Sequence, residues 1–150
     1  MTGNEILQLA AELYASNKPK SEALCRAIIG RAYYAGYHLA LSLLTELGLP
    51  RTSDHKLPAR WLAESGVPQA ARAGRMLDDL YQARRRADYE LTHPAAVRES
   101  RDLRFVKSQV ELAADVKALL AACAVEPRKS QVRAGIQAFQ LRTTKPPGSP

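Results

Sequence analysis

Residues 74–93 read GRMLDDLYQARRRADYELTH. Successive spacings of four, three, four and three place five side chains of this stretch on one face of a helix: Leu77, Tyr81, Arg84, Asp88 and Leu91. This face begins apolar and then carries an arginine and an aspartate four residues apart. Charges rarely lie on a core-facing stripe unless they are paired or functional. The stretch predicts either an ion pair between packed helices or a polar site where helices meet, and the spacing alone leaves both open.

The rest of the chain has helical apolar periodicity and almost no strand signal. Ser21 is a good N-cap, and Gly48 suits the end of the long helix that Ser21 begins. That long helix has apolar residues on more than one side, which predicts that it is central and most buried. The expected fold is all-α, a four-helix bundle with one extra short helix, and the predicted helices are Glu5–Ser16, Glu22–Leu47, Ala59–Ser65, Gln69–Leu91 and Ala95–Ala124.

The C-terminal segment differs from the body. The body, residues 1–126, is predicted to be one domain, and residues 127–150 a basic tail. Within the tail, Ser130–Leu141 is weakly amphipathic, and the composition of Thr143–Pro150 predicts disorder. The chain has 22 basic and 15 acidic residues, a net charge of +7, yet no acid follows Glu126. Much of the surplus charge therefore belongs to the tail, and inside the body the positive charge is local.

Composition excludes several classes of protein. Apolar residues make up 46 % of the chain, which is typical of a globular protein, and no apolar run approaches the roughly 18 residues of a membrane span. The N-terminal residues lack the basic region of a signal peptide, so we expect a cytoplasmic protein. Cys25 and Cys123 fall in helical patterns and are expected to be buried, inert thiols. The histidines and cysteines lack metal-ligand spacing and no glycine-rich phosphate loop is present, so neither a metal site nor a cofactor is predicted.

Four pieces in consistent order carry a family resemblance: a central helix, a loop motif followed by Trp61, a second helix motif and a final helix. Residues 23–44 read ALCRAIIGRAYYAGYHLALSLL, residues 54–56 read DHK, and residues 74–89 include GR, LY, R and ADY at fixed spacing. This pattern closely resembles the HEPN (higher eukaryotes and prokaryotes nucleotide-binding) domain family, with its "RAYYAxFH" central helix and its "LYxxRxxADY" helix. The resemblance covers about residues 19–122.

The resemblance implies an antiparallel four-helix bundle, usually homodimeric, that binds RNA or nucleotides. Many members of the family are metal-independent endoribonucleases that serve as toxins or in antiviral defence, some beside a nucleotidyltransferase-type antitoxin. Other members have lost catalysis and only bind. An endoribonuclease is therefore expected, with a catalytically inactive nucleotide-, RNA- or partner-binding module as the alternative.

The catalytic motif of the family is an arginine followed at short spacing by a histidine, and Arg86…His93 matches it at its longest spacing. Seven residues are two helical turns, so both side chains would point the same way if the helix persisted. An imidazole can deprotonate a ribose 2′-OH, and a guanidinium can stabilise the phosphorane. Arg31…His38 also satisfies the spacing but lies in the central helix, where a structural histidine is the simpler interpretation.

The central helix and residues 74–93 are expected to share a polar network. Arg31, Tyr34 and His38 lie on one face of the central helix, which predicts contacts of the Arg31–Asp88 or Arg84–Tyr34 type. Tyr89 is expected to order this site or to stack on a base, and His55 is interpreted as a solvated loop histidine. The expected phosphate contacts are the remaining local cations, Arg85, Arg98 and Arg101.

Overall fold

The computed structural model describes residues 1–17, 21–144 and 148, and no strand occurs in them. The protein is all-helical, as the periodicity predicts. Its helices are α1 (Gly3–Asn17), α2 (Glu22–Glu46), α3 (Leu57–Ala63), α4 (Pro68–Tyr89), α5 (Pro94–Arg101), α6 (Leu103–Cys123) and α7 (Arg128–Thr143).

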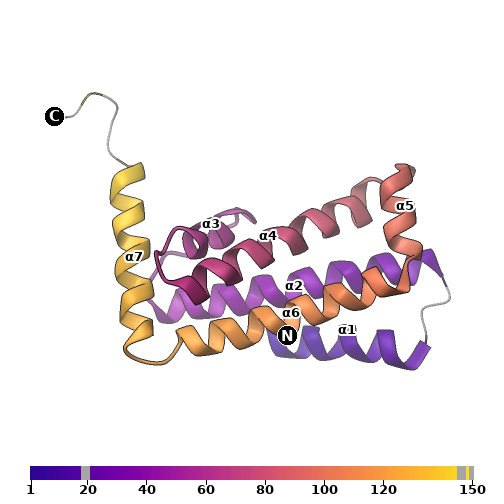
Figure 1. The fold of residues 1–150 in the computed structure, drawn as a ribbon, viewed down its shortest axis with the longest axis horizontal. Helices are drawn as coiled ribbons and strands as arrows, with labels where there is room; N and C mark the ends of the chain where they lie inside the picture. Colours follow the sequence, from indigo (N-terminus) through magenta and orange to yellow (C-terminus); the bar gives the residue numbers. More distant parts are fainter. Residues whose placement is uncertain (18–20, 145–147, 149–150) are drawn as a thin grey trace.

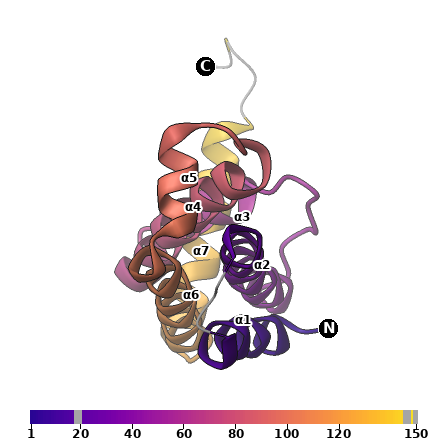
Figure 2. The same cartoon turned by 90° about the vertical axis from the view of Figure 1, so that its right-hand side faces the viewer.

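Four long helices, α1, α2, α4 and α6, lie along one another, and successive ones run in alternating directions (Figure 1). Helix α2 packs on α1, α4 and α6, so it is the central helix (Figure 2). Its side chains are buried on several faces, as expected from its apolar pattern. No helix in the described part of the chain is both long and apolar enough to cross a membrane.

The ends of α2 follow the sequence signals. The Ser21 hydroxyl accepts a hydrogen bond from the Leu24 N–H at 3.2 Å, which satisfies one of the free donors of the first turn. At the other end the chain turns at Gly48, whose φ of 76° lies in the left-handed region that glycine adopts without strain. Both predicted boundaries are confirmed.

The expected single helix over residues 95–124 is wrong, because the chain breaks at Asp102 into α5 and α6. Asp102 has an extended conformation, and its Oδ1 accepts hydrogen bonds from the N–H groups of Arg104 at 2.9 Å and Phe105 at 3.4 Å. The break has neither glycine nor proline, so only this N-capping aspartate marks it in the sequence. Helix α5 consequently turns across one end of the long helices (Figure 1).

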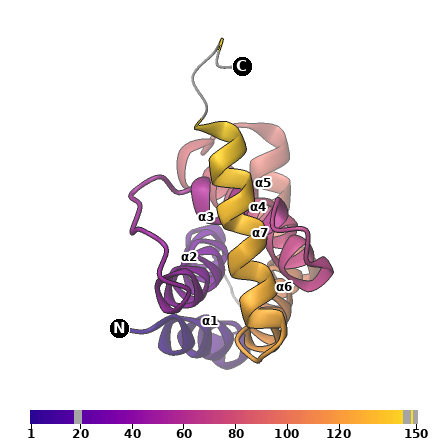
Figure 3. The ribbon, with the colours of Figure 1, turned by 90° about the vertical axis from the view of Figure 1, so that its left-hand side faces the viewer.

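Helix α7 crosses the opposite end of the molecule (Figures 1 and 3). Val132, Ile136 and Phe139 are buried in the same apolar core as the residues of α2 and α4. At Gly135 the helix touches the chain after α3, where a Cβ atom would lie only 1.7 Å from the Ser65 carbonyl oxygen. The weakly amphipathic segment is thus a packed helix. The domain division at residue 126 stays a prediction, and most of the tail predicted to be disordered, residues 145–147 and 149–150, lies outside the described residues.

Candidate functional site

Arg84 is the centre of a polar network between α4 and α2. Its Nη2 donates hydrogen bonds to the hydroxyl oxygens of Tyr34 and Tyr89, both at 2.9 Å. Its guanidinium carbon lies 5.3 Å from the Tyr34 ring centroid and 4.9 Å from the Tyr89 ring centroid. Its Nε is 2.7 Å from the Asp88 carboxylate, although the N–H is not aligned for a hydrogen bond. The predicted Arg84–Tyr34 contact is confirmed, and the charge on this stripe is paired.

The network keeps Arg84 charged although its side chain is only 12 % exposed. Burial by itself lowers the pKa of the guanidinium, because it removes the charge from water. The oxygens of Tyr34, Asp88 and Tyr89 outweigh burial and raise the pKa above its ordinary value. The face that begins with Leu77 therefore opens into a polar site that holds a fixed cation.

Three features of this face differ from what the sequence suggests, and the first is the Arg31–Asp88 contact, the predicted alternative that does not form. Arg31 is exposed, and no ion pair to Asp88 forms; the α2 residue that faces the Asp88 carboxylate is Gly30, whose ideal Cβ position lies 3.6 Å from Oδ1. Leu91 lies beyond the end of α4 and is 60 % exposed, so the stripe ends at Asp88. His38 is exposed at the edge of the network, with its ring centroid 6.5 Å from that of Tyr34.

The interpretation of His55 as a solvated residue is also wrong. His55 is half-buried, and its Nδ1 is 2.9 Å from the hydroxyl of Tyr33. Its ring centroid lies 4.8 Å from that of Tyr37 and 6.3 Å from that of Tyr34. The loop before α3 therefore docks on the tyrosines of α2. The pair Tyr33 and Tyr37, four residues apart on a buried helix, is the sequence signal that could have indicated a polar partner for their hydroxyls.

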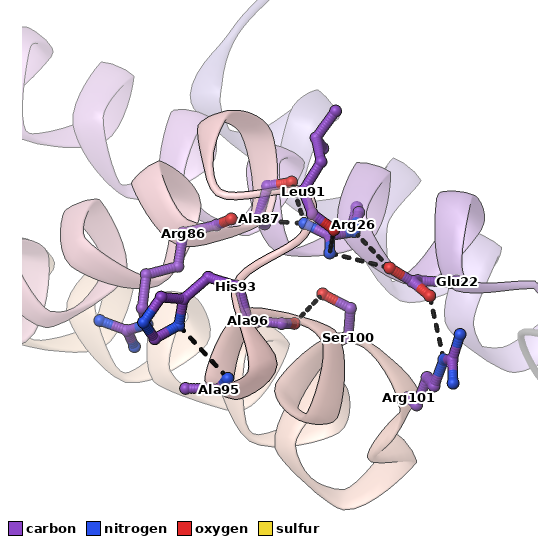
Figure 4. Close-up of polar contacts among 10 residues, drawn as sticks. All are labelled: Glu22, Arg26, Arg86, Ala87, Leu91, His93, Ala95, Ala96, Ser100 and Arg101. Atoms are coloured by element: carbon purple, nitrogen blue, oxygen red, sulfur yellow. Dashed lines mark hydrogen bonds and ion pairs between the residues drawn. The ribbon is translucent and has the colours of Figure 1, made fainter.

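A buried arginine that the sequence analysis missed fixes the turn between α4 and α5 (Figure 4). Arg26, 8 % exposed, donates from Nη1 to the carbonyl oxygens of Arg86 at 3.3 Å and Ala87 at 2.6 Å. From Nη2 it donates to the Leu91 carbonyl at 3.2 Å and to Glu22 Oε1 at 2.8 Å. A cation on the last carbonyls of a helix satisfies free acceptors and complements the helix dipole. The signal in the sequence is an arginine on the same face of α2 as Cys25 and Ile29.

Arg86 and His93 lie on either side of that turn. Because α4 ends at Tyr89, the helix does not persist to His93, and the condition for the two side chains to point the same way is not met. Arg86 Nε donates to Glu99 Oε2 at 2.8 Å, and the His93 Nδ1 accepts a hydrogen bond from the Ala95 N–H at 3.3 Å as the N-cap of α5. No hydrogen bond joins Arg86 to His93 among the contacts of the described residues.

The capping bond selects one tautomer of His93. Since Nδ1 accepts a hydrogen bond from the Ala95 N–H, the neutral ring carries its own proton on Nε2. The side chain is exposed, so this N–H is available to an incoming group. In this state His93 can donate a hydrogen bond from Nε2, and it can act as an imidazolium acid or as a base at Nε2 only after the capping bond breaks.

The predicted phosphate-binding cations lie on the two helices that flank this turn, but they differ in whether a carboxylate already pairs with them. Arg85 and Arg98 are exposed, and neither pairs with a carboxylate in the described part of the chain. Arg101 is 70 % exposed, but its Nε donates to Glu22 Oε2 at 3.0 Å (Figure 4). Tyr89, the last residue of α4, is 66 % exposed and borders the turn. We call Arg85, Arg86, Tyr89, His93 and Arg98 the α4–α5 corner.

In residues 1–17, 21–144 and 148 no group of three histidine, cysteine, aspartate or glutamate side chains is placed to hold a metal ion. Cys25 and Cys123 are buried free thiols whose pKa is raised by burial. Comparison of the chain with protein-family models, with curated proteins and with solved structures gave no match.

Proposed function

We propose that the protein acts on RNA as a metal-independent endoribonuclease of the HEPN type, with a role in a toxin–antitoxin or defence system. The observation that carries the proposal is the α4–α5 corner. It combines free guanidinium groups with an exposed tyrosine ring and an exposed imidazole, at a turn that Arg26 holds in place. Cations that contact phosphates and aromatic rings that stack on bases are the usual elements of single-stranded RNA recognition.

The reaction would need three groups. The ribose 2′-oxygen attacks phosphorus after a base removes its proton, the 5′-oxygen leaves with a proton from an acid, and a 2′,3′-cyclic phosphate results. His93 suits the acid in its imidazolium form, which donates the Nε2 proton and returns to the neutral ring; forming it requires that the capping bond from Ala95 to Nδ1 break. Arg86 suits the phosphorane, provided that phosphate replaces Glu99 as its partner. A second copy of the chain in a homodimer would supply the base through its own histidine, so the proposal includes a homodimer. The proposed fold of each copy is an antiparallel four-helix bundle.

A second function, RNA or nucleotide binding without cleavage, is favoured by the contacts that Arg86 and His93 already make within the protein. Glu99 neutralises Arg86, and the capping bond occupies His93 Nδ1. RNA could still bind through phosphate contacts to Arg85 and Arg98 and through base stacking on Tyr89. This binding does not require Arg86 or His93 to be free. In both versions we propose a cytoplasmic protein, with a nucleotidyltransferase-type antitoxin or another protein as a candidate partner.

The experiment that separates the two functions is cleavage of labelled single-stranded RNA in EDTA. The endoribonuclease predicts products with 2′,3′-cyclic phosphate ends, and loss of cleavage in both His93→Ala and Arg86→Ala. The His38→Ala variant is the matched control, because His38 is an exposed histidine outside the corner, and it should cleave normally. Binding without cleavage, unchanged in both variants, would assign the module. Absence of any RNA binding would reject both.

A further inference from the structure

Helix α7 carries four cations and no carboxylate, and two of these cations have a structural explanation. Arg128 Nη1 donates to the Ala122 carbonyl at 3.1 Å, in the last turn of α6. Arg133 Nη2 lies beside Gly48, 3.9 Å from its ideal Cβ position, just after the end of α2. Each of these guanidinium groups lies at the negative end of a helix dipole.

Arg142 has no such explanation, and Arg60 of α3 shares its surroundings. The guanidinium carbons of Arg60 and Arg142 lie 5.3 Å and 5.9 Å from the ring centroid of the same side chain, Phe139. Both arginines are exposed, and in the described part of the chain neither is within ion-pair distance of a carboxylate. Two like charges are thus held near one ring without a neutralising partner.

The two carboxylates that line a cavity with Arg60 do not change this conclusion. Asp78 and Asp79 line a cavity of about 470 Å³ together with Arg60, Lys56 and Arg75. None of these five side chains forms an ion pair among the described residues. The carboxylates belong to α4, whereas the side of Arg60 that faces Phe139 meets a helix without acidic residues.

We propose that Arg60 and Arg142 bind two neighbouring backbone phosphates of RNA beside the Phe139 ring. Guanidinium groups form paired hydrogen bonds with phosphate oxygens, and phosphates at two unpaired arginines neutralise charges that have no carboxylate partner. Helix α7 lies at the opposite end of the long helices from α5 (Figure 1). The inference rests on the proposed function and deepens it: the substrate is a single strand long enough to reach both the α4–α5 corner and α7.

The two contacts lie at different points along α4: Arg60 shares a cavity with Arg75 and Asp79, whereas the α4–α5 corner begins at Arg85. From Arg75 to Arg86 the helix rises about 16 Å at 1.5 Å per residue. A strand of 20 nucleotides has phosphates for both contacts, whereas a strand of four nucleotides has only three internucleotide phosphates and cannot fill both. Length dependence of binding is therefore the signature of the second contact.

The test measures the binding of fluorescein-labelled RNAs of four and 20 nucleotides by anisotropy, between 50 and 200 mM salt in EDTA, with the full-length chain. The variant R60Q/R142Q should weaken binding of the long strand about tenfold at the lowest salt. It should also lower the slope of log Kd against log salt by about 1.4, since each phosphate contact to a single strand contributes about 0.7. Binding of the short strand should not change. The variant R60K/R142K, which keeps both charges, should retain most of the long-strand affinity.

The matched control is K107Q/K117Q, which removes two exposed cations of α6 and should reproduce wild-type binding. If neither RNA binds the wild-type protein, the proposed function fails. If both RNAs bind but R60Q/R142Q behaves like the control, the proposed function stands and the second contact is rejected. Stabilisation by 10 mM inorganic phosphate that disappears in R60Q/R142Q, with unchanged long-strand affinity, would also overturn the inference and assign a site for free phosphate.

Discussion

The Tyr34 hydroxyl on α2 accepts a hydrogen bond from Arg84 on α4 at 2.9 Å. These two helices are therefore joined by a charged hydrogen bond as well as by apolar packing. Tyr89 accepts from the same nitrogen at the same distance, but this residue is 66 % exposed. These two phenols offer a matched comparison of one interaction in two environments.

The variant Tyr34→Phe should lower the free energy of unfolding by about 1–2 kcal/mol, because a half-buried guanidinium loses an acceptor. The variant Tyr89→Phe removes an equivalent bond at the surface and should cost less than about 0.5 kcal/mol. Urea denaturation followed by the fluorescence of Trp61, the only tryptophan in the chain, measures both. Equal losses would mean that the Arg84–Tyr34 bond is no more shielded from water than the Arg84–Tyr89 bond.

Arg26 should be essential for the turn between α4 and α5. Replacing it with glutamine leaves carbonyl groups of Ala87 and Leu91 without their donor, so we expect a loss of about 2–3 kcal/mol in the free energy of unfolding. The control Arg101→Gln removes a 70 % exposed partner of the same Glu22 carboxylate and should cost less than about 0.5 kcal/mol. Similar losses in the two variants would contradict the role of Arg26 as the cap of α4.

Glu99 should restrain Arg86. If Arg86 contacts phosphate, the variant Glu99→Gln frees its guanidinium and should strengthen RNA binding several-fold at low salt. Glu111→Gln, which frees Lys107 on α6, removes the same charge and should have a smaller effect. Anisotropy titrations compare the two variants, and identical increases would show that only net charge changed.

Tyr33 should make the protein less stable in alkaline solution. Its side chain is fully buried, and burial raises the pKa of its phenol above the ordinary value of 10. Above pH 10 the unfolded chain loses this proton while the folded protein keeps it, so the unfolded state binds fewer protons and stability falls as the pH rises. Tyr33→Phe should reduce the steepness of that fall, measured by urea denaturation between pH 8 and 11. Tyr89→Phe is the surface control. An equal reduction in that variant would contradict the conclusion that Tyr33 causes the loss of stability at high pH.

Helix α7 should belong to the folding unit. Ile136 is completely buried, so Ile136→Ala should cost about 2–5 kcal/mol. Gly135→Ala should be at least as harmful, since the added methyl group would overlap the backbone of Ser65. The exposed α7 variant Gln137→Ala should be neutral or slightly stabilising. Thermal unfolding distinguishes these results, and unchanged melting in Ile136→Ala would indicate that α7 folds separately from the rest.

The sequence predicted what depends on local patterns. The extent of α2, its cap at Ser21 and the all-helical fold follow from apolar spacing and capping chemistry within a few neighbouring residues. The inward position of Arg84 followed from its spacing from Leu77 and Tyr81. Its bond to Tyr34 was expected because both residues lie on faces that were predicted to pack together.

The parts that could not be predicted depend on contacts between distant segments. Arg26 meets carbonyl groups more than 60 positions away, and Arg86 meets Glu99 on a different helix, so no spacing rule relates them. His55 looked solvated because its loop is polar, and only the docking of that loop on Tyr33 buries it. The break at Asp102 was missed because a capping aspartate inside an apolar pattern resembles an ordinary exposed residue.

The contact between Gly135 and Ser65 joins two stretches of main chain with no side chain between them. If α7 slid or rotated at this contact, other residues of the helix, all bulkier than glycine, would meet the same carbonyl oxygen of Ser65. This backbone contact therefore fixes the register of α7 on the rest of the protein. It also fixes where Arg142 lies relative to Arg60 of α3.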